Sequence, residues 1–529
     1  MFSGSNPLDT NMNIFLYGPP GTGKSTIGKI LAGNLKLPFV DLDALIEEKA
    51  NLSISQIMEQ HGETAFRDLE TSMLQQMVDH SSSVTSQVIA LGGGALLREK
   101  NRSLVETHGK VVLLMAELPT LMERLKDDAG KRPLLAGDLH EKLSSLLEQR
   151  REHYASFTIQ VQLDGMAAEQ SVAQIQVQLG YFHLSAMGEY DVLVGRTLAP
   201  HASAGVANPP YAIQNPVIVT DENVAPLHLE KIESVLRSAG HMPRSIVIPA
   251  GEAHKNLDTI SHLWHAFLEY GLDRRSTVIA LGGGVIGDMA GFAASTYMRG
   301  VQWICIPTTL LSMVDASIGG KTGFDLPEGK NLIGSFYPPK LVLADPQVLG
   351  TLPHRELISG MAEVVKHGII SEPELFHLCA RGWDWVRSNL EQVVKRAMAV
   401  KIKVIEEDPY EKGFRAALNL GHTVGHAVEL VSKFELRHGE AVAIGMVVEA
   451  RYAEKIGIAE PGLSDTIAGV LSGYGLPVKI PTDFSYEEIL RVMRVDKKKD
   501  ARKVRFALPA AIGNVQLVEV SDLESVLEK

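Results

Sequence analysis

Short apolar runs alternate with longer helical patterns in the first third of the chain. The runs Ile14–Tyr17, Val88–Leu91 and Val111–Met115 have the length and composition of buried strands. Between them, segments such as Ile54–Met77 follow a helical pattern. Strands and helices that alternate in this way predict a parallel sheet with helices on both faces. We expect this first α/β unit to span residues 1–177.

A second series of strands begins near Tyr190, after a linker expected at residues 178–189. The strands predict a second α/β lobe over residues 190–350, of the Rossmann-like kind. From about His354 the pattern is mostly helical, so a helical lobe is expected at residues 351–529. A cleft between two lobes is a common place for a ligand site. The strand-like runs of the α/β lobe are Asp191–Val194, Val217–Val219, Ser245–Ile248, Thr277–Leu281, Gln302–Ile306 and Leu341–Ala344.

Composition narrows the class of protein. The net charge is −12, which argues against a nucleic-acid partner. Two cysteines, Cys305 and Cys379, exclude a disulfide scaffold and a cysteine-rich zinc site. No apolar run is long enough to span a membrane, and the first residues do not have the pattern of a signal peptide. We therefore expect a cytoplasmic enzyme without a membrane partner.

The segment Gly18–Ser25 follows the first apolar run and precedes a helical pattern, which is the context of a P-loop. Its glycines let backbone N–H groups face phosphate oxygens at a helix N-terminus. Lys24 is expected to reach the β- and γ-phosphates, and the Ser25 hydroxyl to bind Mg²⁺. A P-loop indicates a nucleotide but not a reaction. The phosphate-binding residues expected here are Gly21, Thr22, Gly23, Lys24, Ser25 and Thr26.

Other polar residues of the first unit have ordinary explanations when each is taken alone. Arg67 has the spacing of a helix-surface ion pair with Glu63 or Glu70. A glycine run after a strand is often a simple turn, although it also lets a ligand approach the backbone. The remaining acids and arginines are often solvated. The candidates are Asp41, Asp43, Arg67, Gly92–Gly94, Arg132 and Arg150.

Taken together, these residues resemble shikimate kinase over roughly residues 12–175. The resemblance implies ATP-dependent 3-phosphorylation of shikimate with Mg²⁺, which Asp41 helps to organise. It also implies that Asp43 binds the ring hydroxyls and assists the attacking one, and that Arg132 stabilises the transferring phosphoryl group. A different small-metabolite kinase, such as a gluconate kinase, is the alternative for this half. The resemblance to shikimate kinase further implies that the shikimate carboxylate and ring are held by Arg67, Arg150 and the backbone at Gly93.

The second unit contains a glycine turn of the dinucleotide-binding type. Gly282–Asp288 follows a strand and opens a helix, although it is not a strict G-x-G-x-x-G. Asp221, Glu252 and Lys255 are placed to contact ribose or adenine, and Thr308–Thr309 follows another strand. Each of these has a strand-end turn as its ordinary alternative.

Histidines and a glutamate suggest a metal centre. His422 and His426 are one helical turn apart, and His438 opens the next helical pattern. Glu363 and Lys366 share a face of an earlier helix. One Glu and two His with an open position make a catalytic zinc set. Spacing alone favours His422 and His426 as the histidine pair, with a pair of core histidines as the alternative.

Basic residues are scattered through this acidic second unit, several of them among glycines or apolar neighbours. Such a group suggests a polyanionic substrate. They are Lys321, Lys330, Lys366, Lys401, Arg415 and one lysine of Lys497–Lys499.

The second unit resembles 3-dehydroquinate synthase over roughly residues 190–520. The resemblance implies that Glu363, His422 and His438 bind Zn²⁺ or Co²⁺, and that His426 is a catalytic residue. It places the substrate among Lys321, Asn331, Lys366, Lys401, Arg415, Asn419 and a lysine of Lys497–Lys499. It places NAD⁺ against Asp221, Glu252, Lys255, Gly284, Val285, Ile286, Gly287, Asp288, Thr308, Thr309, Asp315, Lys321 and Lys330.

The implied reaction converts the sugar phosphate DAHP to 3-dehydroquinate with loss of phosphate. A hydride passes to NAD⁺ and returns within each turnover, and the metal acidifies a substrate hydroxyl. A homodimer through this half is expected from the family. The alternatives are another sugar-phosphate cyclase, a polyol dehydrogenase, or an inactive half that regulates the other.

Overall fold

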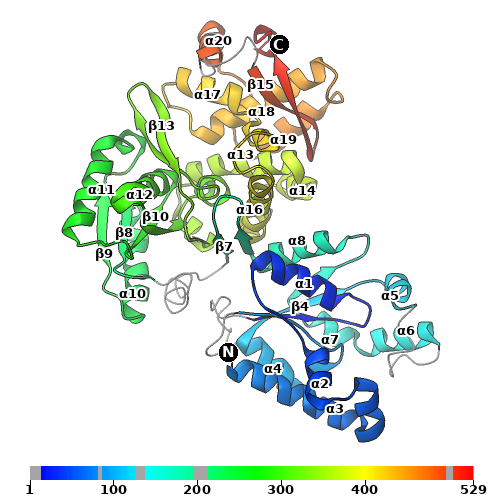
Figure 1. Ribbon diagram of the computed structural model, residues 1–529. Helices are drawn as coiled ribbons and strands as arrows, with labels where there is room; N and C mark the ends of the chain where they lie inside the picture. Colours follow the sequence, from blue (N-terminus) through cyan, green and yellow to red (C-terminus); the bar gives the residue numbers. More distant parts are fainter. Residues whose placement is uncertain (1–12, 81–85, 127–137, 196–212, 496–503, 528–529) are drawn as a thin grey trace. The chain divides into compact units, whose positions relative to one another are not determined.

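The computed structural model describes residues 13–80, 86–126, 138–195, 213–495 and 504–527 (Figure 1). These residues form two compact units, which divide between His183 and Leu184. The division lies inside the segment expected as a linker. That segment contains the end of helix α8 (Ala168–Leu179) and strand β6 (Tyr181–Leu184).

The first unit is built on a parallel five-stranded sheet in the order β2-β3-β1-β4-β5, as expected. Side chains of β1 alternate between two cores: Ile14 and Leu16 pack on one face, Phe15 and Tyr17 on the other. The strands are β1 (Asn13–Tyr17), β2 (Phe39–Asp41), β3 (Val88–Ala90), β4 (Gly109–Met115) and β5 (Ile159–Gln162). The other helices are α1 (Lys24–Leu35), α2 (Leu42–Ala50), α3 (Ile54–His80), α4 (Glu99–His108), α5 (Leu118–Leu125), α6 (Leu139–Gln149) and α7 (Arg151–Ala155).

The second unit begins with the expected α/β lobe. Its sheet has the order β6-β7-β14-β11-β10-β8-β9, and the strands from β7 to β9 are parallel. The strands are β7 (Tyr190–Val194), β8 (Val217–Asp221), β9 (Arg244–Ile248), β10 (Thr277–Gly282), β11 (Gln302–Pro307) and β14 (Leu341–Ala344). Its helices include α10 (Glu230–Ser238), α11 (Leu257–Glu269) and α12 (Gly284–Thr296).

The helical lobe follows, as expected (Figure 1). Two of its helices approach closely because glycines face each other: a Cβ on Gly445 would lie 1.9 Å from the carbonyl oxygen of Gly421. The helices are α13 (His354–Ser371), α14 (Pro373–Ala380), α15 (Trp383–Ser388), α16 (Leu390–Glu407), α17 (His422–Val431), α18 (His438–Lys455), α19 (Leu463–Gly473), α20 (Tyr486–Val495) and α21 (Glu524–Leu527).

Two antiparallel hairpins were not expected from the sequence. One joins β12 (Lys321–Leu326) to β13 (Gly329–Phe336). The other joins β15 (Val504–Ala511) to β16 (Asn514–Val520) and packs on the helical lobe, where Phe506 is fully buried. The first hairpin is rich in glycine and polar residues, so it lacks the alternation that predicts a strand.

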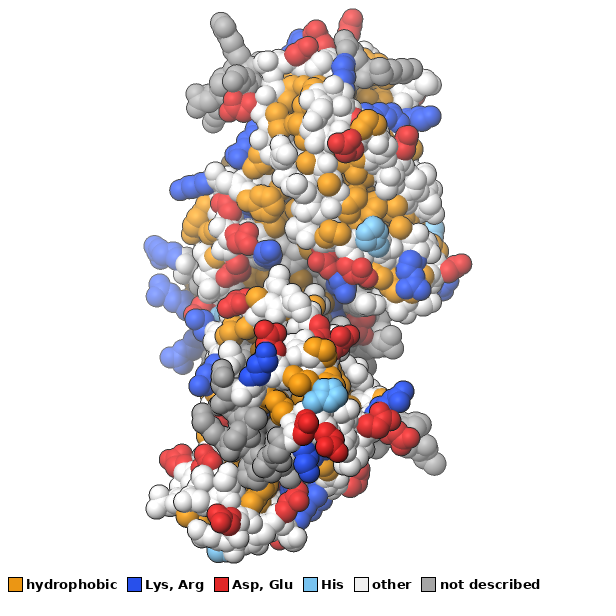
Figure 2. Space-filling model, turned by 90° about the vertical axis from the view of Figure 1, so that its right-hand side faces the viewer, with side chains coloured by type: hydrophobic (Ala, Val, Ile, Leu, Met, Phe, Trp, Pro, Cys, Tyr) orange, Lys and Arg blue, Asp and Glu red, His pale blue; other side chains and the backbone are white. Residues whose placement is uncertain are grey.

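The surface carries mixed charge. On the face drawn in Figure 2, basic and acidic side chains are interspersed among the described residues. No helix in the described part of the chain combines the length and the apolar character needed to cross a membrane.

Candidate phosphate, nucleotide and metal sites

The P-loop backbone requires glycine at three positions. Gly18 has a φ of 146°, and a Cβ there would lie 2.2 Å from the carbonyl oxygen of Leu114 in the adjacent strand. Gly21 and Gly23 have φ values of 86° and 78°, in the left-handed region that glycine adopts without strain. The loop therefore turns sharply from β1 into α1 with its backbone open to a ligand.

Lys24 and Ser25 lie at the first turn of α1. The Lys24 ammonium donates to the carbonyl of Gly18 at 2.8 Å, and the Ser25 hydroxyl donates to Asp41 Oδ2 at 2.5 Å. Asp41 is also the N-cap of α2, because its Oδ1 accepts from the backbone N–H of Asp43 at 3.1 Å. The structure thus places a hydroxyl and a carboxylate beside the phosphate loop. Thr22, Ser25 and Thr26 complete the expected set, with Thr22 buried and the other two exposed.

A cluster of charged side chains surrounds the glycine turn after β3. The Arg67 guanidinium donates to Glu70 Oε2 at 2.6 Å and to Glu63 Oε1 at 3.1 Å. The ion pairs proposed as the ordinary explanation of Arg67 are therefore present. Arg67 nevertheless lies against the glycine turn, since a Cβ on Gly94 would lie 2.6 Å from Arg67 Nη2.

Asp43 and Arg150 join the same cluster. A Cβ on Gly92 would lie 2.8 Å from Asp43 Oδ1 and equally close to Glu70 Oε1. Arg150 Nη1 donates to the carbonyl of Gly93 at 2.6 Å. Two guanidinium groups and a carboxylate thus meet at one glycine turn, a set suited to a carboxylated polyol. Arg132, the remaining expected residue of this half, lies outside the described residues.

Glu70 is the residue of this cluster that the sequence reasoning missed as a site residue. Its side chain is fully buried and holds the Arg67 guanidinium in place. The available signal was the three-residue spacing of Arg67 and Glu70, which is too common on helices to stand out.

The expected nucleotide-binding residues lie at one edge of the second sheet. Asp221 ends β8, Gly282 ends β10, and Thr308 follows β11, and these strands are neighbours. Carboxyl ends of parallel strands are the usual place for a nucleotide in such a sheet. The Thr308 N–H donates to the Gly282 carbonyl at 2.9 Å, which ties two of these turns together. Gly284, Val285, Ile286 and Gly287 form the first turn of α12, and Thr309 Oγ1 accepts from the N–H of Ser312 at 3.1 Å.

Lys255 connects this edge to the β12–β13 hairpin. It is almost fully buried and lies 2.7 Å from Asp288 Oδ2 in α12. It also donates to Asn331 Oδ1 at 2.6 Å. Lys330, the neighbour of Asn331, lies 3.8 Å from Glu252 Oε1. Asn331, expected at the substrate, thus contacts a residue expected at the nucleotide.

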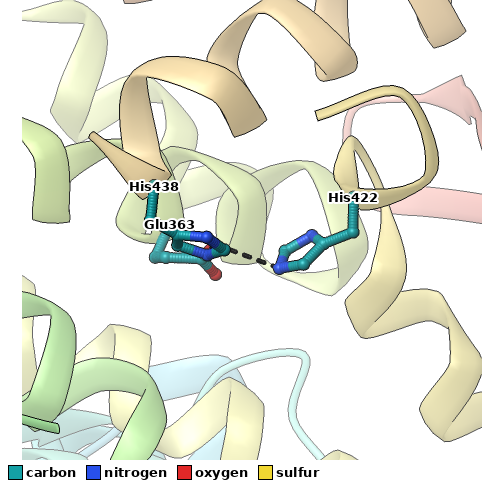
Figure 3. A group of neighbouring side chains, drawn as sticks. All are labelled: Glu363, His422 and His438. Carbon is teal, nitrogen blue, oxygen red and sulfur yellow. Dashed lines mark ion pairs between the residues drawn. The ribbon is translucent and has the colours of Figure 1, made fainter. Parts of the chain in front are cut away.

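Glu363, His422 and His438 converge as a candidate metal centre (Figure 3). They come from α13 and from the first residues of α17 and α18. Nε2 of each histidine lies 3.6 Å from Glu363 Oε1. Ligand atoms around a tetrahedral ion with bonds of about 2.1 Å are about 3.4 Å apart, so this spacing fits a divalent cation.

The other ring nitrogens of the two histidines are also held. His422 Nδ1 lies 3.1 Å from the Leu420 carbonyl oxygen, and His438 Nδ1 lies 3.3 Å from Glu429 Oε2. Both acceptors favour a proton on Nδ1, and Nε2 is the atom of each ring that faces Glu363. Holding Nδ1 in this way is the usual support of a metal-binding histidine.

The electrostatics of the group suit a cation. Burial opposes charge on Glu363, but Lys366 and the two histidines hold the pKa of that carboxyl well below its usual range. Burial and the Lys366 ammonium lower the pKa of His422, which keeps its imidazole neutral. Burial opposes protonation of His438, yet hydrogen bonds to Glu363 and Glu429 raise its pKa to about 9. A metal ion therefore has to displace a proton from His438.

His426 does not belong to this group of three, although spacing alone favoured it. Its ring centroid lies 5.1 Å from that of His422 and 5.8 Å from that of His438. It is exposed, beside the candidate ligands.

A second group of ligand atoms comprises Asp315, Glu363 and His367. Lys401 already neutralises Asp315, the carboxylate that this group does not share with the first, which makes it the poorer cation site.

Basic residues expected at the substrate surround the metal group. Lys366 forms a buried ion pair with Glu363. Lys401 donates to Asp315 Oδ1 at 2.5 Å. Burial opposes charge on Asp315, but the Lys401 ammonium holds the pKa of that carboxyl well below its usual range. These side chains form one network of alternating charge, in which Glu363, Lys366 and Lys401 are buried and Asp315 is partly exposed.

Glu411 links two further expected residues and was missed in the sequence. Its Oε2 lies 2.9 Å from Lys321 Nζ, and its Oε1 accepts from Asn419 Nδ2 at 2.9 Å. Arg415 is nearly fully buried and donates to the Pro409 carbonyl in the same loop. No spacing or motif marks Glu411, because its partners come from other segments. The Lys497–Lys499 run lies outside the described residues.

The fold and these sites define the class of protein: a P-loop phosphotransferase unit followed by a nucleotide- and metal-binding enzyme unit. A family model described as shikimate kinase matches residues 20–179. Models described as 3-dehydroquinate synthase N-terminal and C-terminal match residues 245–359 and 360–499.

Individual proteins agree with these matches. A 3-dehydroquinate synthase from Crocosphaera subtropica is 44% identical over 313 residues, which cover 58% of this chain and 86% of that protein. The solved 2-epi-5-epi-valiolone synthase from Streptomyces hygroscopicus with NAD⁺ and Zn²⁺ bound is 30% identical with a TM-score of 0.57, covering 64% of this chain and 94% of that chain. A 2-deoxy-scyllo-inosose synthase complexed with carbaglucose-6-phosphate, NAD⁺ and Co²⁺ is 25% identical with a TM-score of 0.60, covering 66% and 99%.

The chain belongs to the shikimate kinase family in its first unit and to the 3-dehydroquinate synthase family in its second. It is a bifunctional enzyme of the shikimate pathway, with a phosphotransferase and a carbon–oxygen lyase on one polypeptide.

Proposed function

We propose that the two sets of converging side chains carry the two activities. In the first unit, the P-loop backbone and Lys24 bind the phosphates of ATP. Ser25 and Asp41 hold Mg²⁺, directly or through water. The 2.5 Å hydrogen bond between these two side chains supports their acting together. Positioning and charge neutralisation are the main contributions that a protein makes to phosphoryl transfer.

Shikimate binds at the glycine turn after β3. Arg67 and Arg150 bind its carboxylate, and Glu70 keeps the Arg67 guanidinium in position. Asp43 holds the ring hydroxyls and accepts the proton of the attacking one. The proposal is supported by the close approach of these side chains to Gly92–Gly94. Arg132 stabilises negative charge on the transferring group.

In the second unit, Glu363, His422 and His438 hold Zn²⁺ or Co²⁺, and the carboxyl edge of the sheet holds NAD⁺. When bound, the metal would supply a Lewis acid for a substrate hydroxyl, and the nucleotide would supply a reversible hydride acceptor. The donor set fits Zn²⁺ or Co²⁺, because two imidazoles, which bind a metal in their neutral form, and one buried carboxylate meet at a common point.

The remaining residues bind the substrate DAHP. Lys366, Lys401 and Arg415 neutralise its phosphate and carboxylate and fix its orientation. Lys321 and Asn419 complete the set and are bridged by Glu411. His426, exposed beside the metal ligands, holds and moves a proton during the ring-forming steps. Asn331 contacts the substrate from the hairpin side.

We also propose that the enzyme is cytoplasmic and forms a homodimer through its synthase half, as is expected for this family. Light scattering of the full chain tests the second point. A mass of one chain at micromolar concentration would contradict it.

The convergence of both Nε2 atoms on Glu363 Oε1 carries the assignment of the second unit. Paired variants test both halves at once. Lys24→Ala is expected to abolish phosphorylation of shikimate and leave dehydroquinate formation unchanged, and His422→Ala is expected to do the reverse. Loss of both activities in either variant would contradict two independent sites.

A further inference from the structure

Glu429 has two partners that belong to different parts of the second unit. It lies on α17, two turns after His422, and its side chain is 11% exposed. Its Oε2 lies 3.3 Å from His438 Nδ1, and its Oε1 lies 3.2 Å from Lys330 Nζ. One carboxylate thus serves a candidate metal ligand and the tip region of the β12–β13 hairpin.

The contact with Glu429 determines which nitrogen of His438 is available to a metal ion. An ionised carboxylate at Nδ1 accepts a hydrogen bond from that nitrogen, which leaves Nε2, the nitrogen that faces Glu363, as the atom available to a metal ion. The partner of His422 Nδ1 is instead a neutral backbone carbonyl. A carboxylate is the stronger acceptor, so it makes His438 the more basic ligand.

The second contact anchors the hairpin. Lys330 has Glu252 of the α/β lobe at 3.8 Å and Glu429 of the helical lobe at 3.2 Å. Its ammonium also lies 4.1 Å from the ring centroid of Phe434, in the turn after α17. The neighbouring Asn331 is held by Lys255, which pairs with Asp288 in the nucleotide-binding helix. The hairpin therefore spans from the nucleotide edge to the metal group, and Glu429 is its attachment at the metal end.

We propose that Glu429 is a positioning residue with two roles. It orients His438 for the metal ion, and through Lys330 it fixes the β12–β13 hairpin to the helical lobe, so that the hairpin stays over the nucleotide edge of the sheet. This inference rests on the metal ligands and the nucleotide position proposed above. Glu429 would then join the metal centre and the hairpin directly through a single side chain.

Metal binding is the first test. Glu429→Gln keeps the shape of the side chain but removes its charge, and it is expected to weaken Co²⁺ binding about 10- to 100-fold. Binding is measured by competition with a chromophoric chelator, and the visible absorption of bound Co²⁺ reports its ligand geometry, which is expected to change. Glu435→Gln makes the same substitution at an exposed site nearby and is expected to match the wild type. The melting temperature of the metal-free protein and the kinase activity show that both variants are folded.

The outcomes separate this inference from the proposed function. His422→Ala and His438→Ala are expected to abolish tight Co²⁺ binding, and if they do not, the proposed metal centre is wrong. If they do and Glu429→Gln binds Co²⁺ like Glu435→Gln with an unchanged spectrum, the role at His438 is overturned.

Nucleotide binding is the second test, made by calorimetry with NAD⁺ on the metal-free enzyme. Glu429→Gln and Lys330→Met are both expected to weaken NAD⁺ binding, and the double variant is expected to be no weaker than Lys330→Met alone. Wild-type affinity in Glu429→Gln, or additive losses in the double variant, would overturn the anchoring role.

Discussion

Glu411 Oε2 lies 2.9 Å from the Lys321 ammonium, in an ion pair that joins the loop after α16 to the first strand of the β12–β13 hairpin. The same carboxylate accepts from Asn419. Glu411 thus bridges two groups that we assign to substrate binding. Its carboxylate binds one cation and one amide donor, the same kinds of partner that we expect an anionic group of the substrate to have.

The first prediction concerns this carboxylate. Glu411→Ala leaves Lys321 and Asn419 without their common partner, so we expect the synthase kcat/KM to fall about tenfold or more. Kinase activity is expected to be unchanged. Glu374→Ala, on the exposed side of α14, is the matched control and should leave both activities intact. Equal synthase activity in the two variants would remove Glu411 from the site.

Arg67 is predicted to act in both binding and stability. Arg67→Ala should raise the KM for shikimate strongly, because one of two carboxylate-binding guanidiniums is lost. It also leaves Glu70 buried without its ion-pair partner, which is expected to destabilise the first unit by about 3 kcal/mol. Steady-state kinetics and urea unfolding measure the two effects.

Arg98→Ala is the control for this prediction. It removes an ion pair with Asp68 in which the two side chains are 35% and 68% exposed. Such exposed pairs contribute less than about 1 kcal/mol. A shikimate KM that is the same in Arg67→Ala and Arg98→Ala would exclude Arg67 from substrate binding.

Gly445 is predicted to be required for the metal centre. A Cβ there would lie 1.9 Å from the carbonyl oxygen of Gly421, immediately before His422. Gly445→Ala should therefore destabilise the second unit by more than about 2 kcal/mol and displace His422 from Glu363. Gly469→Ala on α19 has open space around the added methyl and should be neutral or slightly stabilising. Thermal unfolding and Co²⁺ titration of the two variants check this, and equal behaviour would contradict the close packing of α17 and α18.

Much of the fold could be predicted from the sequence, because both sheets are built largely from apolar runs, and β1, β3 and β10 end in glycine-rich turns. The strand Ile14–Tyr17 and the loop Gly18–Ser25 are examples in which pattern and motif agree. The β12–β13 hairpin could not be predicted in this way. Its strands are stabilised by contacts with distant segments, such as Lys255 with Asn331, rather than by an alternating apolar face.

The metal group shows where spacing fails. A helical turn places His422 and His426 on one face, but a metal site also needs ligands from other elements. Packing of α18 on α17 brings His438 Nε2 to 3.6 Å from Glu363 Oε1. The spacing of the histidines in the sequence does not predict this contact, and only the family resemblance indicated that His438 is a ligand. Glu411 and Glu429 could not be found from local pattern at all, because their partners lie on other elements.

The most direct test of the bifunctional account is a pair of assays on the purified full chain. One follows ADP release with ATP, excess Mg²⁺ and shikimate, and the other follows 3-dehydroquinate formed from DAHP with NAD⁺, each before and after treatment with a zinc-selective chelator. We predict that both activities are present, that chelation removes only the second, and that added Zn²⁺ or Co²⁺ restores it. Dehydroquinate formation that survives complete removal of the metal, or the absence of either activity, would contradict the account.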